Sequence, residues 1–278
     1  WKYLEMETDL FHKKIPVPIL RVGKRGEVSI SEKNIIEIKN GLYITRVAPH
    51  FCGSVIFFGR EVNNLLTSYP EPTQLGWFRP WFGGIHPLLF IDEEKFPGWM
   101  HKEAFTHRIV STEKCNIPWK GVKVICTSNE VKGIQLETQY LTTAFSNLLV
   151  IEHALVNLTS APFTVYTGVS FYLQPEGSLE EATLYYEQNG LQERRRTSYG
   201  GWTRCRDWAA VKGKTTFLTL IADSIVVADM GKEGAHLYSI TKSKIPPFST
   251  VQYVSYLVAA DSLEQSQNYK FLRGVPWK

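Results

Sequence analysis

The chain has 278 residues and a formal charge of +4, from 31 basic and 27 acidic side chains. Hydrophobic residues make up 44% of it and charged residues 21%, a balance that excludes disordered and fibrous chains. Apart from one tight run at residues 194–196, the basic residues are dispersed, so no nucleic-acid partner is expected. No apolar run reaches the roughly 18 residues of a membrane helix, and no membrane association is expected.

Apolar residues recur with a period of about two along most of the chain, which predicts strands that each pack on one face. After a proline-rich entry at 13–20, strands are expected at 41–49, 54–59, 121–128, 133–143 and 147–159. Further strands are expected at 163–175, 215–223, 224–230, 235–241 and 250–260. The one expected helix is 262–274, where Asp261 or Ser262 can cap the start and Gly274 can end it.

Strands that follow one another without intervening helices predict antiparallel sheets, and more than ten of them fit two large sheets. We therefore predict an all-β sandwich with one short C-terminal helix, as a single domain over residues 1–278. Residues 1–33 are expected to lie at the edge of that domain. Because the sequence begins at Trp1 rather than Met, it can be part of a longer protein with a linked partner domain.

Four cysteines, Cys52, Cys115, Cys126 and Cys205, lack the C-x-x-C spacing of a zinc site. Free and mostly buried thiols are expected, with two disulfides as the alternative. This composition favours a cytoplasmic chain, and the sequon at Asn157 matters only if the chain is secreted.

No metal and no cofactor are expected. The segment with His101, Glu103 and His107 could be written as a metal site, but it lacks a fourth ligand. The chain contains no glycine-rich phosphate loop, no nucleotide fingerprint and no nucleophile elbow.

Three segments in this order resemble galactose mutarotase-like domains, which include aldose 1-epimerases and hexose-phosphate mutarotases. They read NIIEIKNGLYITRVAPHFCGSVIFFGREVNNLL from residue 34, GWFRPWFGGIHP from residue 76 and LLVIEHALVNLTSAPFTVYTGVSFYLQP from residue 148. The resemblance covers roughly residues 34–272. It implies a β-supersandwich of two large antiparallel sheets that binds a sugar on its concave face, in a superfamily with both epimerases and non-catalytic domains.

The resemblance departs at the catalytic residues. Active members of the family carry a histidine in an H-x-Y-F-like run on the central strand and a late glutamate as the opposing base. Here the strand reads GVSFYLQP, with Phe171 and Tyr172 but no histidine, and the late glutamate that stands out, Glu233, falls in an expected turn. Ring opening needs one group to take a proton and another to give one. A non-catalytic or weakly catalytic carbohydrate-binding domain is therefore expected.

The segment GWFRPWFGGIHP supplies candidate binding residues, because sugars need aromatic platforms beside planar hydrogen-bonding groups. The candidate platforms are Trp77, Trp81 and Phe82, and the candidate donors are Arg79 and His86. The alternative is that these rings fill the core of the sandwich.

A second cluster, YGGWTRCRDWAAV at 199–211, places Trp202, Arg204, Arg206 and Trp208 on one face if it forms a strand. This face would suit a carbohydrate groove, with a structural cation–π ladder as the alternative. If Arg79 and Arg206 converge, they favour an acidic sugar.

Two other functions compete with carbohydrate binding. One is an active epimerase, with His86 as the acid and Asp207 or Glu233 as the base. The other is a structural domain whose aromatic face docks against a partner domain.

Overall fold

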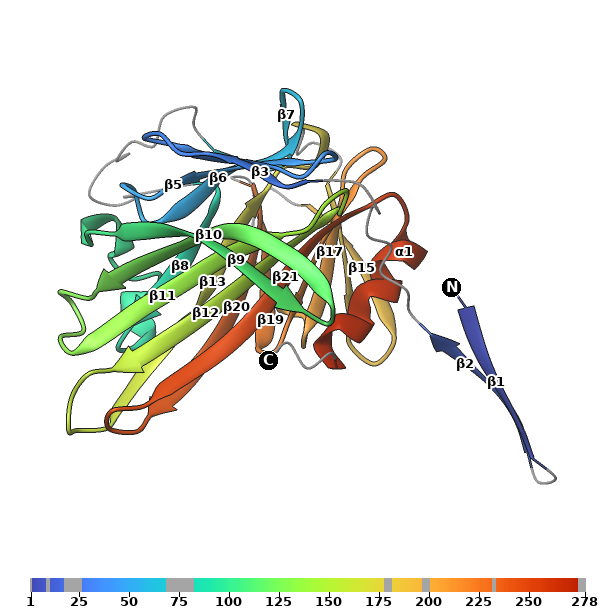
Figure 1. Ribbon diagram of the computed structural model, residues 1–278. Coiled ribbons are helices and arrows are strands. Elements are labelled where there is room, and N and C mark those ends of the chain that lie inside the picture. Colours follow the sequence, from blue (N-terminus) through green and yellow to red (C-terminus); the bar gives the residue numbers. More distant parts are fainter. Residues whose placement is uncertain are drawn as a thin grey trace.

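Two large antiparallel β-sheets stack face to face in the computed structural model (Figure 1). It describes residues 27–68, 83–177, 182–196, 201–231 and 234–274, with the backbone alone of 2–8 and 11–17. Two further strands, β1 (Lys2–Thr8) and β2 (Phe11–Val17), pair with each other and with neither large sheet. The prediction of an all-β fold with two antiparallel sheets is confirmed.

One sheet, called the β12 sheet here, has nine strands within the described residues. Its order is β15 (Leu191–Arg195), β14 (Thr183–Glu187), β17 (Trp208–Lys212), β18 (Phe217–Ala222), β21 (Thr250–Ala260), β12 (Leu148–Asn157), β11 (Ile134–Thr142), β10 (Ile117–Thr127) and β9 (Thr106–Lys114).

The other sheet, called the β13 sheet, has ten strands within the described residues. Its order is β16 (Trp202–Arg204), β19 (Ile225–Gly231), β20 (Gly234–Ile245), β13 (Phe163–Leu173), β8 (Ile85–Phe90), β6 (Ser54–Arg60), β5 (Ile44–Ala48), β4 (Ile36–Lys39) and β3 (Ser29–Ser31), with β7 (Asn63–Asn64) beside β6.

Alternation along each strand separates the core from the outer faces. On β13, Val169, Phe171 and Leu173 face the core, where they pack in one cluster with Leu149 and Ile151 of β12. The residues between them point away from the other sheet, because successive strand side chains take opposite faces. The outer face of the β13 sheet can therefore carry polar groups without disturbing the core.

The C-terminal segment covers the outer face of the β12 sheet. Helix α1 (Leu263–Asn268) begins at Ser262, whose side chain accepts a hydrogen bond from the Gln265 amide, and continues as the 3₁₀ turn η4 (Tyr269–Gly274). The predicted helix is thus present, with a short α-helical part. The Tyr269 hydroxyl donates to Asn147 Oδ1 at 2.8 Å, which ties this segment to the sheet. Within the described residues, no helix has the length and apolar character needed to span a bilayer.

Three short 3₁₀ turns complete the described secondary structure: η1 (Glu93–Lys95), η2 (Met100–Lys102) and η3 (Pro175–Gly177). The side chain of Asn157, the residue of the sequon, is 1% exposed and closes the end of β12. Its Nδ2 donates to the Ala161 and Pro246 carbonyls at 2.7 and 3.0 Å. Asn157 is therefore a structural residue in the folded chain.

Candidate functional site

The centre of the outer face of the β13 sheet carries two histidines and two tyrosines on neighbouring strands. Cross-strand pairing sets His86 of β8 beside Ser170, and sets Tyr172 of β13 beside His236 of β20. The Tyr172 ring stacks on His86 at 5.6 Å and meets His236 edge-on at 4.4 Å between centroids. Tyr238 completes this group, the His–Tyr cluster, at 6.4 Å from Tyr172.

Burial keeps both histidines of the cluster neutral at pH 7. It lowers the pKa of His86 to about 4, against a smaller opposing effect of a hydrogen bond to the Gly83 backbone. Burial likewise lowers the pKa of His236 to about 4. The Tyr172 and Tyr238 hydroxyls are hydrogen-bonded to each other, and burial raises both of their pKa values. The cluster is thus a polar but uncharged group of side chains.

A hollow of about 620 Å³ lies on the same face, toward the β16 edge of the sheet. We call it the aromatic hollow. Its aromatic residues are Phe90, Phe96, Tyr166 and Trp202, its aliphatic residues are Ile225, Val227 and Ile240, and its remaining residues are Glu93, Arg204, Thr241 and Lys242. This mixture of apolar area with a few charged groups is typical of small-molecule sites.

Trp202 is the exposed aromatic ring of this hollow, with 58% of its surface accessible. Its ring lies 5.3 Å from that of Tyr238, and the edge-on ring of Phe96 lies 5.4 Å away. These two contacts hold the indole on the outer face, and they link the aromatic hollow to the His–Tyr cluster. An exposed ring held by its neighbours can receive a flat ligand without first losing much side-chain freedom.

Charged groups surround Tyr166 at the other wall of the hollow. The Tyr166 hydroxyl donates to Glu93 Oε1 at 2.7 Å, and Lys242 Nζ lies 5.2 Å from the Tyr166 ring centroid. Arg204 is exposed on β16, and it makes no hydrogen bond or ion pair with another described residue. The hollow therefore presents two cations and one carboxylate that already accepts a hydrogen bond.

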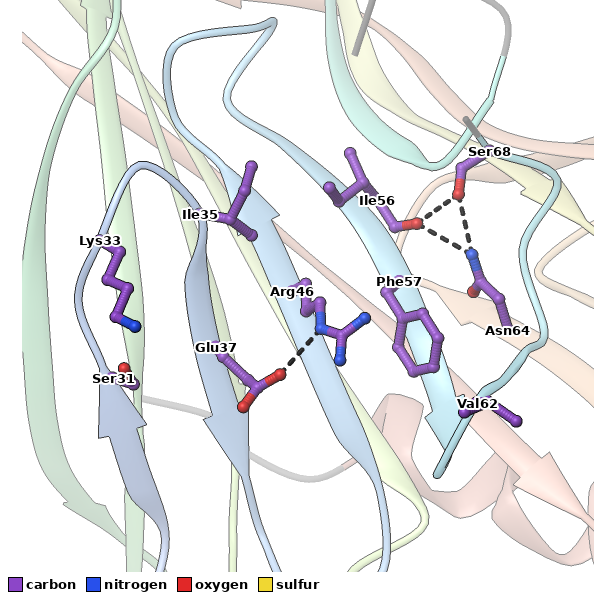
Figure 2. A pocket seen from close by; sticks show the side chains of 10 residues that line it. All are labelled: Ser31, Lys33, Ile35, Glu37, Arg46, Ile56, Phe57, Val62, Asn64 and Ser68. Atoms are coloured by element: carbon purple, nitrogen blue, oxygen red, sulfur yellow. Dashed lines mark hydrogen bonds and ion pairs between the residues drawn. The ribbon is translucent and has the colours of Figure 1, made fainter. Parts of the chain in front are cut away.

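A second hollow, of about 580 Å³, lies on the outer face near the β3 edge and is shown in Figure 2. Arg46 Nε donates to Glu37 Oε2 at 2.8 Å, and the guanidinium lies 4.6 Å from the Phe57 ring centroid. Hydrogen bonds from Lys39 and Arg46 lower the pKa of Glu37. Asn64 Nδ2 donates to the Ile56 carbonyl and to Ser68 Oγ, so it fixes the far wall. The polar groups of this hollow largely satisfy one another.

Both residues of the Gly83–Gly84 pair before His86 have a left-handed backbone. Their φ angles are +149° and +70°, and a Cβ on Gly84 would lie 2.2 Å from the Val55 carbonyl oxygen. The close approach lets β8 start beside β6, and it directs His86 to the outer face two residues later. Of the other candidates in this segment, Trp77, Arg79, Trp81 and Phe82 lie outside the described residues.

The predicted common face of residues 202–208 is wrong. Strand β16 ends at Arg204, and a turn with Arg206 at a φ of +56° leads to β17 in the other sheet. Trp208 is 1% exposed and packs under α1, where its Nε1 donates to the Ser266 carbonyl at 3.4 Å. Trp202 therefore lies on a hollow, Arg206 lies in a turn, and Trp208 lies in the core.

Asp207, one of the two proposed bases, does not meet His86 in the structure. Asp207, in the turn between the sheets, forms an ion pair with Arg273 of η4, on the side of the β12 sheet. Glu233 lies outside the described residues. The described side-chain hydrogen bonds of His86 go to Ser170 Oγ, 3.4 Å from each ring nitrogen.

Glu103 and His107, from the segment considered as a metal site, make contacts with different partners. The Glu103 carboxylate accepts hydrogen bonds from Ser128 Oγ and the Asn129 amide, at 2.8 and 2.9 Å. His107 Nε2 lies 2.9 Å from Glu32 Oε1. Across the described residues, no group of three or more His, Cys, Asp or Glu side chains could hold a metal ion.

Four residues of this face were not predicted from the sequence: Phe96, Tyr166, His236 and Tyr238. Alternation along β20 carried a usable signal, since His236, Tyr238, Ile240 and Lys242 share one face. Phe96 carried no such signal, because it follows a 3₁₀ turn and reaches Trp202 only through the tertiary fold.

The arrangement of strands matches a known fold. No family model matches the sequence, and no curated protein does. Solved structures do match, and they show that the chain has the galactose mutarotase-like, aldose 1-epimerase type of fold. A galactose mutarotase-like protein from Clostridium acetobutylicum is 14% identical with a TM-score of 0.60, over 86% of this chain and 100% of that one.

Two further structures show the range of proteins that share the fold. A candidate aldose 1-epimerase from Klebsiella pneumoniae is 11% identical with a TM-score of 0.61, over 91% of this chain and 88% of that one. A GH36 alpha-galactosidase from Geobacillus stearothermophilus is 10% identical with a TM-score of 0.57, over 87% of this chain but 42% of that one. Some structural neighbours thus carry this fold as one part of a longer chain.

Proposed function

We propose that this chain is a carbohydrate-binding domain with little or no catalytic activity, and that the sugar binds in the aromatic hollow. The observation that carries the proposal is the exposed Trp202 ring beside Arg204 and Lys242 on the outer face of the β13 sheet. The fold supports the proposal by analogy, and the site carries the argument because a fold alone does not determine a function.

The chemistry of the hollow suits a sugar ring. A pyranose has a flat face of C–H groups and a rim of hydroxyls, so it needs an aromatic surface flanked by hydrogen-bonding side chains. Trp202 supplies the exposed aromatic face, with Phe96 and Tyr166 as further aromatic walls, while Arg204 and Lys242 supply donors around it. A volume of about 620 Å³ is in the usual range for ligand sites.

The His–Tyr cluster supports weak or absent catalysis. Anomer interconversion needs an acid and a base that both reach the sugar. His86 is 5% exposed and neutral at pH 7, and Asp207 is engaged with Arg273. A buried histidine without a described carboxylate partner is a poor proton donor near neutral pH.

An active epimerase is the second candidate, because His86 and His236 flank Tyr172 on adjacent strands. One neutral imidazole would take the proton of the anomeric hydroxyl while the other gave a proton to the ring oxygen of a sugar bound over Tyr172. Following anomer interconversion by polarimetry would test this function. A catalysed rate that falls at least a hundredfold in His86→Ala would support the epimerase, and an activity that survives would remove His86 from the mechanism.

Titration of the intrinsic fluorescence against neutral, phosphorylated and acidic sugars tests carbohydrate binding. Trp202→Ala should weaken binding about tenfold or more, equivalent to about 1.4 kcal/mol. Trp99→Ala is the matched control, since Trp99 is also exposed but lies outside the hollow. If no sugar binds and the chain self-associates through Trp202, the docking domain replaces this proposal.

The other expectations remain proposals with separate support. Four free cysteines favour a reducing compartment, so we retain a cytoplasmic location. A linked partner domain is supported by neighbours in which the fold covers 42% or 47% of the chain.

A further inference from the structure

We propose that the ligand of the aromatic hollow is an acidic oligosaccharide of at least two sugar rings, with Arg204 and Lys242 as the groups that recognise its negative charge. This inference rests on the proposed function and specifies its ligand class. It follows from the charges that face the hollow and from the distance between them.

The charges of the hollow are unbalanced in favour of an anion. Two cations, Arg204 and Lys242, line it together with one carboxylate, Glu93. Glu93 accepts the Tyr166 hydroxyl at 2.7 Å, so one of its oxygens is already satisfied. Lys242 lies over the Tyr166 ring rather than in an ion pair with a described residue. A ligand with a negative group would therefore meet cations that lack an anionic partner in the described structure.

Arg204 is well suited to such a group. A guanidinium can bind a carboxylate or a sulfate with two parallel hydrogen bonds, which a lysine cannot do. Its position on β16, two residues from Trp202, puts it on the same face as the indole. A sugar stacked on Trp202 would therefore bring its substituents within reach of the guanidinium.

The strand register separates the two cations by more than one sugar ring. Arg204 pairs with Val227 of β19, and Val227 pairs with Tyr238 of β20, which lies four residues before Lys242. With neighbouring strands about 4.8 Å apart and about 3.3 Å per residue along them, the two Cα atoms are roughly 16 Å apart. The Lys242 side chain leans toward β13, with Nζ 5.2 Å from the Tyr166 ring centroid, and so away from β16. A pyranose stacked on Trp202 therefore lies nearer to Arg204 than to Lys242, whereas a short oligosaccharide can contact both.

The aromatic residues between the cations fit this length. Tyr166 pairs with Lys242 across β13 and β20, and Trp202 lies on β16 at the opposite side of the hollow. The Tyr166 ring is stacked on Phe90 at 5.2 Å between centroids and lies under Lys242, so it offers its edge. One ring of an oligosaccharide can stack on Trp202 while the next lies beside that edge and Lys242. The aliphatic residues between them supply apolar area, and a sugar that covered it would strengthen the charge contacts at the rim by displacing water.

The inference is tested by isothermal titration of the full chain with five probes: digalacturonate, its methyl ester, neutral digalactose, sulfated digalactose and monomeric galacturonate. The methyl ester is the matched probe, because it keeps the size and hydroxyls of the acid but not its charge. We expect the acids of two rings to bind about tenfold more tightly than the ester or the neutral sugar, and more weakly at higher salt.

Two substitutions test which residues cause the tighter binding of the acidic sugars. Arg204→Gln and Lys242→Gln should each remove most of the preference for the acid while binding of the neutral sugar persists. Arg108→Gln, which removes an exposed arginine of β9 in the other sheet, should change nothing. Comparison of digalacturonate with sulfated digalactose identifies the acidic group.

Each result has one meaning. Equal affinity for acid, ester and neutral disaccharide overturns the acidic ligand but keeps the sugar site. Equal affinity for galacturonate and digalacturonate overturns the two-ring length. A preference for acids that survives both substitutions overturns the roles of Arg204 and Lys242. Failure of every probe to bind overturns this inference, and a flat response in the fluorescence titrations as well overturns the proposed function.

Discussion

His153 Nε2 on β12 lies 2.5 Å from Thr167 Oγ1 on β13, so a hydrogen bond crosses the core from one sheet to the other. The Thr167 hydroxyl donates to the Leu88 carbonyl at 3.0 Å, and its oxygen must therefore accept from Nε2–H. The other nitrogen, Nδ1, then accepts from Thr138 Oγ1 at 3.1 Å. The neutral imidazole is fully satisfied, and burial lowers its pKa to about 3.

Because three buried histidines have lowered pKa values, we expect the protein to lose stability in weak acid. The pKa values of His86, His153 and His236 are lowered to about 4, 3 and 4 from 6.5. Below pH 6.5 the unfolded chain binds protons that the native chain does not, so the free energy of unfolding falls as the pH decreases toward 4. Each histidine lowers the free energy of unfolding by up to about 1.4 kcal/mol for each pH unit of this decrease.

Urea unfolding between pH 7.5 and 4.5 measures this effect. His153→Gln should lower the free energy of unfolding at pH 7. It should also reduce the slope of that free energy against pH by an amount equivalent to close to one bound proton. His50→Gln, at an exposed position, is the control and should leave the slope within error. A slope unchanged in His153→Gln would show that His153 takes up its proton over the same pH range in the native and the unfolded chain, which would contradict a lowered native pKa.

The loop after β10 depends on one carboxylate. Glu103 accepts hydrogen bonds from Ser128 Oγ, from the amides of Asn129 and Glu130, and from Asn129 Nδ2. Glu103→Ala should cost about 3 kcal/mol of unfolding free energy, because hydrogen bonds to a charged group are lost and buried donors are left unpaired. Glu103→Gln, which keeps one acceptor oxygen, should cost less.

Chemical denaturation with a proteolysis assay of this loop measures both changes. Glu113→Ala, at an exposed position of β9, is the control and should be nearly neutral. If Glu103→Ala proved equally neutral, the loop would be held by its backbone alone.

The four thiols should differ in reactivity. Cys115 is exposed in the turn between β9 and β10, while Cys52, Cys126 and Cys205 are buried. Burial raises the pKa of Cys126 and of Cys205 to about 12, which suppresses the reactive thiolate, and it raises that of Cys52 as well. The expectation of free and mostly buried thiols is confirmed.

Labelling with a disulfide reagent tests this difference. The native chain should react rapidly at one thiol and the denatured chain at four, and Cys115→Ser should abolish the rapid phase. Fast labelling of a second thiol in the native chain would mean that a buried cysteine opens to solvent.

Substitution of Gly84 tests the turn before β8, and Gly190, in the turn between β14 and β15, is the matched control. Both have positive φ angles, +70° and +109°. A Cβ added to Gly84 would lie 2.2 Å from the Val55 carbonyl oxygen, whereas a Cβ added to Gly190 would have no neighbouring atom within 4 Å. Alanine at either position incurs backbone strain, and alanine at Gly84 also forces β6 and β8 apart. Gly84→Ala should therefore cost at least about 2 kcal/mol more than Gly190→Ala.

Thermal and urea unfolding of both variants measures the difference. Circular dichroism at 25 °C should first establish that each variant is folded. Equal losses would mean that backbone strain alone, and not the close approach of β6, explains the glycine at position 84.

The sequence by itself determined the class of fold. Period-two alternation in segments such as 133–143 and 163–175 predicted strands with one buried face, because the side of a strand to which each side chain points depends on local spacing alone. The order of segments carried the resemblance that the solved structures support. The C-terminal helix was likewise readable, since Ser262 caps it through a contact within its own first turn.

Only the tertiary structure decided which residues share the outer face of the β13 sheet. Trp202 and Trp208 are six positions apart, yet the turn at Arg206 sends them to different sheets. Conversely, His86, Tyr172 and His236 are far apart in sequence and meet through the pairing of β8, β13 and β20. Local spacing sets which way a strand side chain points. Its neighbours are set by long-range pairing, which depends on the packing of the whole chain.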